Sequence, residues 1–189
     1  HGIDIYNGES FTNYNSKNFL KGDNIYDLLL DDHENVWIAS YNEGVCQYDG
    51  KEFVWINETN GLSGEHVLSL ESDKSGNMWT GTDGDGVDII NLRSFENLNE
   101  GNGIINDYIY AICEDKHNQI WFGGEDGGLM MYKENHYFEM PQFKTLLSKQ
   151  INKIYEDSKG NIWIATEKKG VIKISGSEFM FFKEENGLI

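Results

Sequence analysis

The segment I-N-K-I-Y-E-D-S-K-G-N-I-W-I-A-T-E-K-K-G-V at residues 151–171 sets the pattern of the whole chain. A second copy, V-L-S-L-E-S-D-K-S-G-N-M-W-T-G-T-D-G-D-G-V, lies at residues 67–87. In both copies an Asp stands six residues before a Trp, and a Gly stands seven residues after that Trp. Self-similarity of this kind identifies a repeat architecture, and the repeat rather than the local residue pattern decides the fold class.

The frame recurs every 42 residues without an insertion. Three columns of residues, each with four members, define it. They are Asp31, Asp73, Asp115 and Asp157; Trp37, Trp79, Trp121 and Trp163; and Gly44, Gly86, Gly128 and Gly170. An aromatic residue follows sixteen positions after each Trp, at Phe53, Phe95, Tyr137 and Phe179.

The frame also extends past the four complete units. Gly2, Tyr6 and Phe11 match the end of a preceding repeat, and Asn186-Gly187-Leu188 matches the start of a following one. We therefore divide residues 1–189 into the end of one blade and four repeats. The ranges are 1–23, 24–65, 66–107, 108–149 and 150–189. The sequence is expected to be a window from a longer array.

Each unit has room for four short strands separated by turns rich in Gly, Asn, Asp and Ser. In the first unit the strands are predicted at 25–30, 36–40, 44–48 and 52–56. Connections of three to six residues are too short for a crossover helix, so neighbouring strands must be antiparallel. A four-stranded antiparallel unit of this length is typical of a propeller blade. The predicted fold is all-β, a β-propeller segment of four blades near 24–57, 66–98, 108–139 and 151–183, with half a blade at 1–14.

The pattern at 151–171, its copy at 67–87 and the recurring N-G-L together resemble the two-component regulator propeller repeat. The resemblance implies a seven-bladed propeller, of which four and a half blades are a part. It also implies the extracytoplasmic sensor region of a membrane-bound histidine kinase. Hybrid kinases of this kind in Bacteroides-type gut bacteria respond to glycans.

Composition limits the partners. The chain carries 32 acidic and 15 basic residues, a formal net charge of -17. So acidic a chain repels phosphate backbones and anionic lipid surfaces, which excludes nucleic-acid binding and membrane binding as leading functions. No stretch of the sequence is long and apolar enough to insert into a bilayer.

The repeated columns are interpreted as scaffold. Asp73 stands just before a turn whose amide groups, at Gly76 and Asn77, need acceptors, and an Asp side chain closes such a turn locally. A large ring at a fixed strand position packs one sheet on the next, so the four Trp residues are predicted to fill the space between blades.

The sequence contains no convincing motif for metal binding or catalysis. Asp83-Gly84-Asp85-Gly86-Val87-Asp88 resembles a calcium loop, but its Gly residues fall at loop positions 2 and 4, whereas an EF-hand needs acids at positions 1, 3 and 5 and Gly at position 6. The five His residues form no ligand pattern. Cys46 and Cys113 are expected to be small buried residues. A sialidase resemblance implies three arginines around a carboxylate, whereas this chain has Arg93 alone. No nucleophile elbow, phosphate-binding loop or zinc-protease motif is present, so no catalytic residue, metal or cofactor is predicted.

Position predicts where a ligand would bind. In a four-stranded meander, the loop between strands two and three and the loop between blades emerge on one face. These loops vary most between the repeats, and a fixed scaffold with varied loops is how repeat proteins present binding residues. The candidate ligand-binding residues are Tyr41, Asn42, Glu43, His66, Asp83, Asp85, Tyr108, Glu125, Asp126, Glu167 and Lys168. The alternative is neutral drift of exposed loops.

The favoured function is a non-catalytic sensor segment of a two-component histidine kinase. It would lie outside the cytoplasmic membrane, in the periplasm of a bacterium, with its parent anchored in the inner membrane, and bind an oligosaccharide. Its other partners would be the remaining blades of the parent propeller, or a second copy, because unpaired strand edges favour association. A secreted lyase of propeller type, acting on a polysaccharide or antibiotic, and a protein-interaction scaffold are the alternatives.

Overall fold

The computed structural model describes residues 2–91, 95–101, 103–104, 106–134, 136–143 and 149–183. Its strands form five antiparallel sheets, and the first is the hairpin of β1 (Ile3–Tyr6) and β2 (Phe11–Tyr14). The second sheet contains β3 (Ile25–Leu30), β4 (Val36–Ser40), β5 (Gly44–Tyr48) and β6 (Phe53–Ile56). The third contains β7 (Val67–Ser72), β8 (Met78–Thr82), β9 (Val87–Ile90) and β10 (Phe95–Leu98).

The last two sheets repeat this meander. One contains β11 (Ile109–Glu114), β12 (Ile120–Gly124), β13 (Leu129–Lys133) and β14 (His136–Glu139), with a short 3-10 turn, η1 (Glu125–Gly127), between β12 and β13. The other contains β15 (Ile151–Glu156), β16 (Ile162–Thr166), β17 (Gly170–Ser175) and β18 (Glu178–Phe182). The prediction of four four-stranded antiparallel blades preceded by half a blade is confirmed. The complete blades are numbered from one to four below, so that the first contains β3–β6, the second β7–β10, the third β11–β14 and the fourth β15–β18.

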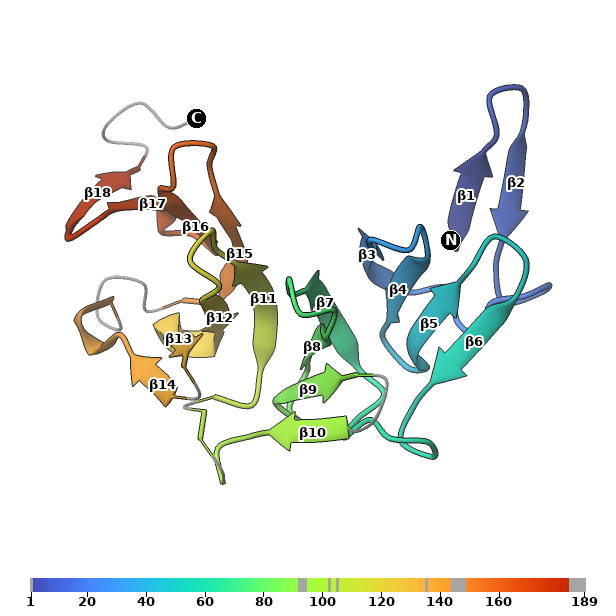
Figure 1. Cartoon of the computed structure of the whole chain (residues 1–189), viewed down its shortest axis with the longest axis horizontal. Helices are drawn as coiled ribbons and strands as arrows, with labels where there is room; N and C mark the ends of the chain where they lie inside the picture. Colours follow the sequence, from blue (N-terminus) through green and yellow to red (C-terminus); the bar gives the residue numbers. More distant parts are fainter. Residues whose placement is uncertain are drawn as a thin grey trace.

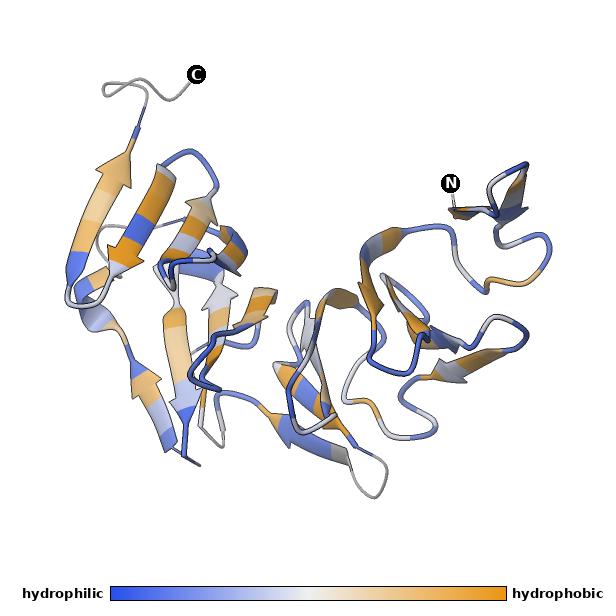
Figure 2. Cartoon of the chain, turned by 45° about the horizontal axis from the view of Figure 1, so that its top comes forward, coloured by the Kyte–Doolittle hydropathy of each residue, from blue (hydrophilic) through white to orange (hydrophobic). Residues whose placement is uncertain are grey.

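The sheets follow one another along an arc, with their first strands on its inner side (Figure 1). Along that inner side β3 contacts β7, β7 contacts β11, and β11 contacts β15. Hydrophobic residues gather on the strands, while the turns at both ends are mostly hydrophilic (Figure 2). The four-stranded sheets therefore pack face to face around a common centre, as the blades of a propeller do.

Three of the four repeated Trp residues, Trp37, Trp79 and Trp121, pack between one blade and the next. Trp163, in the last blade, stacks on Phe182 of its own sheet, with ring centres 5.5 Å apart. The ring of Trp79, on β8, lies 5.7 Å from that of Phe122 and 5.5 Å from that of Tyr132, both in the next blade. Trp37 packs in the same way in a cluster with Met78 and other residues of the second blade. Burying such large rings between sheets supplies much of the apolar contact that joins one blade to the next.

An Asp carboxylate holds each of these rings in place. In the second blade, Oδ1 of Asp73 accepts hydrogen bonds from the backbone N–H groups of Ser75 and Asn77, at 2.9 Å each. Oδ2 of Asp73 accepts one from the indole Nε1–H of Trp79, at 2.8 Å. The other blades form the same indole bond at 2.8, 2.9 and 2.9 Å. Each Asp thus ties the turn between the first two strands to the ring that the second strand buries.

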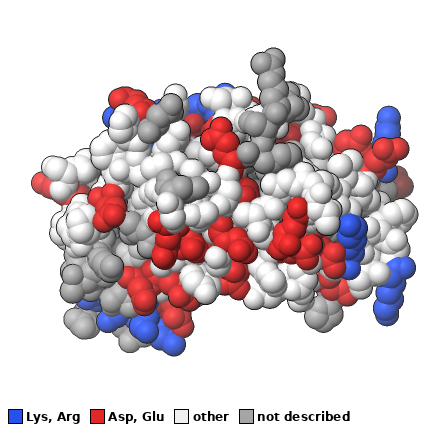
Figure 3. Space-filling view, turned by 90° about the horizontal axis from the view of Figure 1, so that it is seen from below, with Lys and Arg blue, Asp and Glu red and all other residues white. Residues whose placement is uncertain are grey.

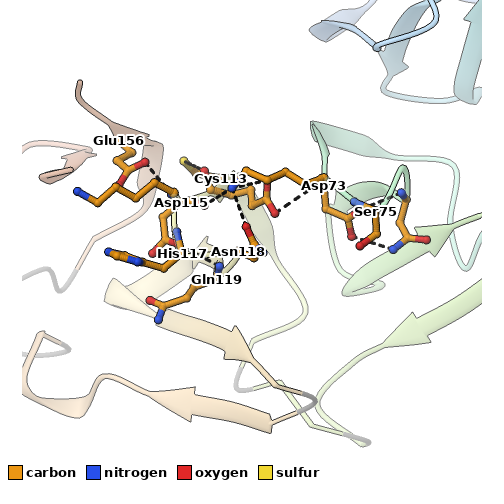
Figure 4. Close-up of polar contacts among 12 residues, drawn as sticks. Asp73, Ser75, Cys113, Asp115, His117, Asn118, Gln119 and Glu156 are labelled. Atoms are coloured by element: carbon orange, nitrogen blue, oxygen red, sulfur yellow. Dashed lines mark hydrogen bonds and ion pairs between the residues drawn. The ribbon is translucent and has the colours of Figure 1, made fainter. Parts of the chain in front are cut away.

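Figure 4 shows the equivalent cluster around Asp115, whose side chain faces the backbone of His117 and Gln119. One detail differs from the turn that the sequence predicts. The amide of Gly76 donates to the backbone carbonyl of Asp73, at 2.9 Å, rather than to its side chain. The carboxylate is therefore left to bind the indole as well as the turn.

The Gly column follows from close backbone approach. Gly44, Gly86 and Gly170 have φ angles of 80, 83 and 82°, a region that favours glycine. A Cβ at Gly86 would overlap the carbonyl oxygen of Leu98 on the neighbouring strand. Gly128 differs, with a φ of -64°, because η1 precedes it in the third blade. Arg93 and Asn186-Gly187-Leu188, which the sequence analysis used, lie outside the described residues.

No helix among the described residues has the length and apolar character needed to cross a membrane.

We predict that Asp115→Ala lowers the free energy of unfolding by about 2–4 kcal/mol, because Asp115 is 4% exposed and loss of its carboxyl group leaves the Trp121 indole N–H without an acceptor. Urea unfolding measures this. Asp49→Ala is the matched control, since Asp49 accepts two turn N–H bonds but is exposed and holds no indole. It should cost less than about 1 kcal/mol. Equal losses in the two variants would contradict the role assigned to the indole bond.

Candidate functional site

The first strand of every blade contains a β-bulge at the same repeat position. In β3 the register shifts between Ile25 and Asp27, which leaves Tyr26 without a partner on β4. The corresponding shifts in β7, β11 and β15 release three further residues. The bulged residues are Tyr26, Leu68, Tyr110 and Asn152. A bulge re-aims the side chain that it releases, and bulges are common beside binding sites.

All four bulged residues line one pocket of about 560 Å³, which we call the central pocket. Tyr41, Asp83 and Gln150, from the loops at the same end of the blades, complete its wall. Because the first strands lie on the inner side of the arc, this pocket lies at the loop end of the common centre. Its volume is within the range of small-molecule binding sites.

The wall combines aromatic faces with a carboxylate. The rings of Tyr26 and Tyr41 stack with centroids 5.4 Å apart, and Tyr26 is 58% exposed. The hydroxyl of Tyr41 donates to Oδ2 of Asp83, at 2.7 Å. That bond to a negative acceptor raises the pKa of Tyr41, so its hydroxyl stays protonated at neutral pH. The other oxygen of Asp83 has no hydrogen-bond donor within the described parts of the chain.

A second tyrosine pairs with a second acid. The hydroxyl of Tyr110 lies 3.3 Å from Oε1 of Glu125, to which it donates. Burial, followed by the negative charge of Glu125, raises the pKa of Tyr110. Both phenols are therefore neutral donors that hold carboxylates beside the pocket, and this end of the site is negative.

An acid also lies on the inner strand β7. Glu71 is largely withdrawn from water, and this burial raises the pKa of its carboxyl group to about 7. Lys153 on β15 lowers that pKa, whereas Glu114 on β11 and Asp27 on β3 raise it. Four inner strands thus bring ionisable groups together near the common centre.

The structure brings several predicted residues together. Tyr41 and Asp83 line the pocket, and Glu125 lies behind Tyr110. His66 packs edge-on against Tyr41 with centroids 4.6 Å apart, and the two residues form a β-bridge. Tyr108 forms the corresponding bridge with Asp83. These residues from three successive blades form one side of the site.

Other predicted residues lie apart from the pocket. Asn42 and Asp126 are exposed at loop tips. The side chain of Glu43 faces Gly22, and that of Asp85 faces Gly64. Glu167 and Lys168 pair with each other at 2.9 Å. None of these six side chains lines the pocket described above.

The bulged residues were absent from the predicted site. Their signal in the sequence is a column of unlike residues, Tyr, Leu, Tyr and Asn, directly after a column of Ile and Val. A variable position next to a fixed apolar one on a strand predicts a side chain outside the core. It does not by itself predict that the side chain faces a pocket, because that depends on the bulge.

No cluster of three or more potential ligands suited to a metal ion is found in the described ranges. Cys46 and Cys113 are buried and free, and burial raises the pKa values of their thiols to about 12 and about 11. Both thiols are therefore protonated and unreactive at neutral pH.

A family model described as "Two component regulator propeller" matches residues 61–84, 103–126 and 145–168. The three matched segments begin 42 residues apart, at the period of the repeat. No curated protein matches the sequence.

Solved structures share the fold. The extracellular domain of a hybrid two component system from B. thetaiotaomicron superposes with a TM-score of 0.83 at 24% identity, over 99% of this chain and 26% of that one. Virginiamycin B lyase from Staphylococcus aureus superposes with a TM-score of 0.67 at 16% identity, over 85% of this chain and 55% of the lyase. The WD40 propeller domain of Doa1 gives 0.60 at 13% identity, over 82% and 51%. This chain thus spans about a quarter of the first of these proteins and about half of the other two.

The buried acid on β7 predicts a pH dependence of stability. Because the pKa of Glu71 is raised in the folded state, its protonated form is favoured there, and stability is lost as the pH rises from about 4.5 to about 7. Glu71→Gln should therefore leave the free energy of unfolding unchanged at pH 4 and raise it by about 1–3 kcal/mol at pH 8. Urea unfolding of both proteins across this range tests this. A difference between them that does not change with pH would contradict it.

Proposed function

From the two component regulator propeller repeats of which this chain is built, we propose that it is a non-catalytic ligand-recognition segment of a two-component sensor and that it binds an oligosaccharide in the central pocket. The observation that carries the proposal is the column of bulged residues, since every blade contributes one of them to the same pocket. A purely structural repeat has no need of such convergence at a variable position.

The chemistry of the wall favours a sugar. The stacked rings of Tyr26, which is exposed, and Tyr41, which is half-buried, offer apolar faces to the C–H surface of a pyranose. Asp83, Gln150 and Asn152 offer carboxylate and amide groups that accept or donate hydrogen bonds to hydroxyl groups. An apolar platform with a few polar groups that fix orientation is typical of specific small-molecule sites.

Charge favours a neutral oligosaccharide over a sulfated or uronic one. Asp83 and Glu125 stand at or beside the pocket, and the chain as a whole carries a net charge of -17. Acidic residues also outnumber basic ones on the side of the molecule in Figure 3. An anionic sugar would meet repulsion at short range and on approach.

The sensor role and its place in the cell complete the proposal. The similarity to an extracellular domain of a hybrid two component system supports a location outside the cytoplasmic membrane, in the periplasm. There the segment would pass ligand binding to a histidine kinase in the same parent chain. The other blades of the parent propeller, or a second copy of the segment, would be its protein partners.

A lyase is the second candidate, because virginiamycin B lyase shares the fold. A lyase needs a base that removes a proton and an acid that assists the leaving group. Three tyrosines line the pocket, but its described lining includes neither a histidine nor a lysine. The hydroxyl groups of Tyr41 and Tyr110 have raised pKa values, so neither is deprotonated at neutral pH and able to act as a general base. These features favour binding over catalysis.

Binding to a panel of neutral and acidic oligosaccharides, followed by calorimetry, tests the proposal. Tyr26→Ala should weaken the binding of a neutral oligosaccharide by about five- to thirtyfold, since loss of a stacking face costs about 1–2 kcal/mol. Tyr155→Ala is the matched control, because Tyr155 is equally exposed, at 60% against 58% for Tyr26, but does not line the pocket. Its affinity should equal that of the unchanged chain.

Three results would contradict the proposal. They are equal losses in the two tyrosine variants, a preference for acidic sugars, and conversion of a bound glycan to an unsaturated product. The last of these would establish the lyase.

A further inference from the structure

A second cavity, of about 290 Å³, lies between the first and second four-stranded sheets. Trp37, Ile56, Met78 and Ile90 give it an apolar lining. The Asp31-Asp32 pair and Asp73, from the turns between first and second strands, stand at its rim. The central pocket lies at the other end of the blades, among the loops between second and third strands, so the two sites are separate.

The next interface shows what fills this position elsewhere in the repeat. Lys74 occupies the place in the second blade that Asp32 occupies in the first, 42 residues earlier. The ammonium of Lys74 donates to the carbonyl of Asp115 at 3.1 Å and to Oδ1 of Asn118 at 2.7 Å, both in the following blade. It also lies 3.6 Å from a carboxylate oxygen of Glu114. The acceptors Asp115 and Asn118 can be followed in Figure 4.

Lys116 repeats this contact in the third blade, where its ammonium lies 3.4 Å from the carbonyl of Lys159. Two interfaces are therefore bridged by a lysine that reaches the turn of the next blade. The first interface has Asp32 instead, and Asp32 forms no ion pair with any residue that the structure describes.

A second repeat position places an ammonium group on the ring of the repeated Trp. In the fourth blade the ammonium of Lys173 lies 5.4 Å from the ring centre of Trp163, a cation–π contact. The equivalent residues of the first blade are Gln47 and Trp37, which both line the cavity. Two contacts within this protein thus place a lysine ammonium at the following turn or on the Trp ring, whereas the first interface has Asp32 and Gln47 at these positions, with His33 also lining the cavity.

The hollow itself has a steric cause. At the second interface Tyr132 packs on Trp79 with ring centres 5.5 Å apart. The residue equivalent to Tyr132 at the first interface is Ile90, which is smaller and leaves space beside Trp37. The missing ring and the missing lysine chain together leave a cavity that is apolar inside and acidic at its rim.

We propose that this cavity binds a primary ammonium ion with a short apolar chain, the ammonium at Asp32 and the chain against Trp37 and Met78. The bound amine would reproduce the contacts that Lys74 and Lys173 make in the later blades. An organic cation fits better than a metal ion, because the described residues offer no group of three or more metal ligands. Asp31 supports the negative rim: hydrogen bonds from Trp37 and Asn35 outweigh its partial burial and lower its pKa.

Titration with n-butylammonium tests the proposal, with the assigned indole N–H signals of the tryptophans as the readout in NMR spectra. The signal of Trp37 should shift and saturate, while those of Trp79 and Trp121 stay in place. The neutral isostere 1-butanol should bind about tenfold or more weakly, since it lacks the charge. Asp32→Asn should weaken butylammonium binding by a similar factor.

Asp32→Lys should abolish the shift, because the new ammonium would take the ligand's place, as Lys74 does at the next interface. Glu9→Lys, in the exposed turn between β1 and β2, makes the same change in net charge far from the cavity and should leave binding unchanged. Unshifted positions of the other indole signals report that each variant is folded. Absence of saturable binding, equal binding of 1-butanol, or a full response in Asp32→Lys would overturn the proposal.

Discussion

The hydrogen bond from a Trp indole to an Asp carboxylate is the interaction on which the rest of this structure depends. It joins two tasks in one residue pair, since the carboxylate closes the first turn of the blade and also fixes the ring that packs on the next blade. Because the pair recurs every 42 residues, each blade presents the same face to its neighbour. The arc of sheets follows from repetition of one local contact.

A scaffold fixed in this way leaves other positions free to vary. The bulge on each first strand turns one side chain out of the ladder, so that Tyr26, Leu68, Tyr110 and Asn152 differ without disturbing the strand pairing. The same holds at the turns, where Asp32 replaces a lysine without loss of the Asp31–Trp37 bond. Ligand chemistry can therefore change blade by blade while the fold stays the same.

Sequence reasoning predicts the fold well, because a repeat with Asp, Trp and Gly in register leaves few alternatives to a propeller blade. It also predicts the face that carries Tyr41 and Asp83, since that face follows from strand order alone. It fails for Tyr26 and Asn152, because the variable column that contains them does not reveal the bulge, which arises from the pairing of two strands. It does not separate Tyr41 and Asp83, which line the pocket, from Glu43 and Asp85, whose side chains face Gly22 and Gly64.

Hydrogen exchange of the five Trp indole protons, followed by NMR, tests the central role of the Asp–Trp bond most directly. Trp55 is an internal reference, because it stands outside the repeated column and donates its indole proton to no described residue. We predict that the indole protons of Trp37, Trp79, Trp121 and Trp163 exchange far more slowly than that of Trp55, since each is held by an Asp. Exchange of those four protons at the rate of Trp55 would contradict the account.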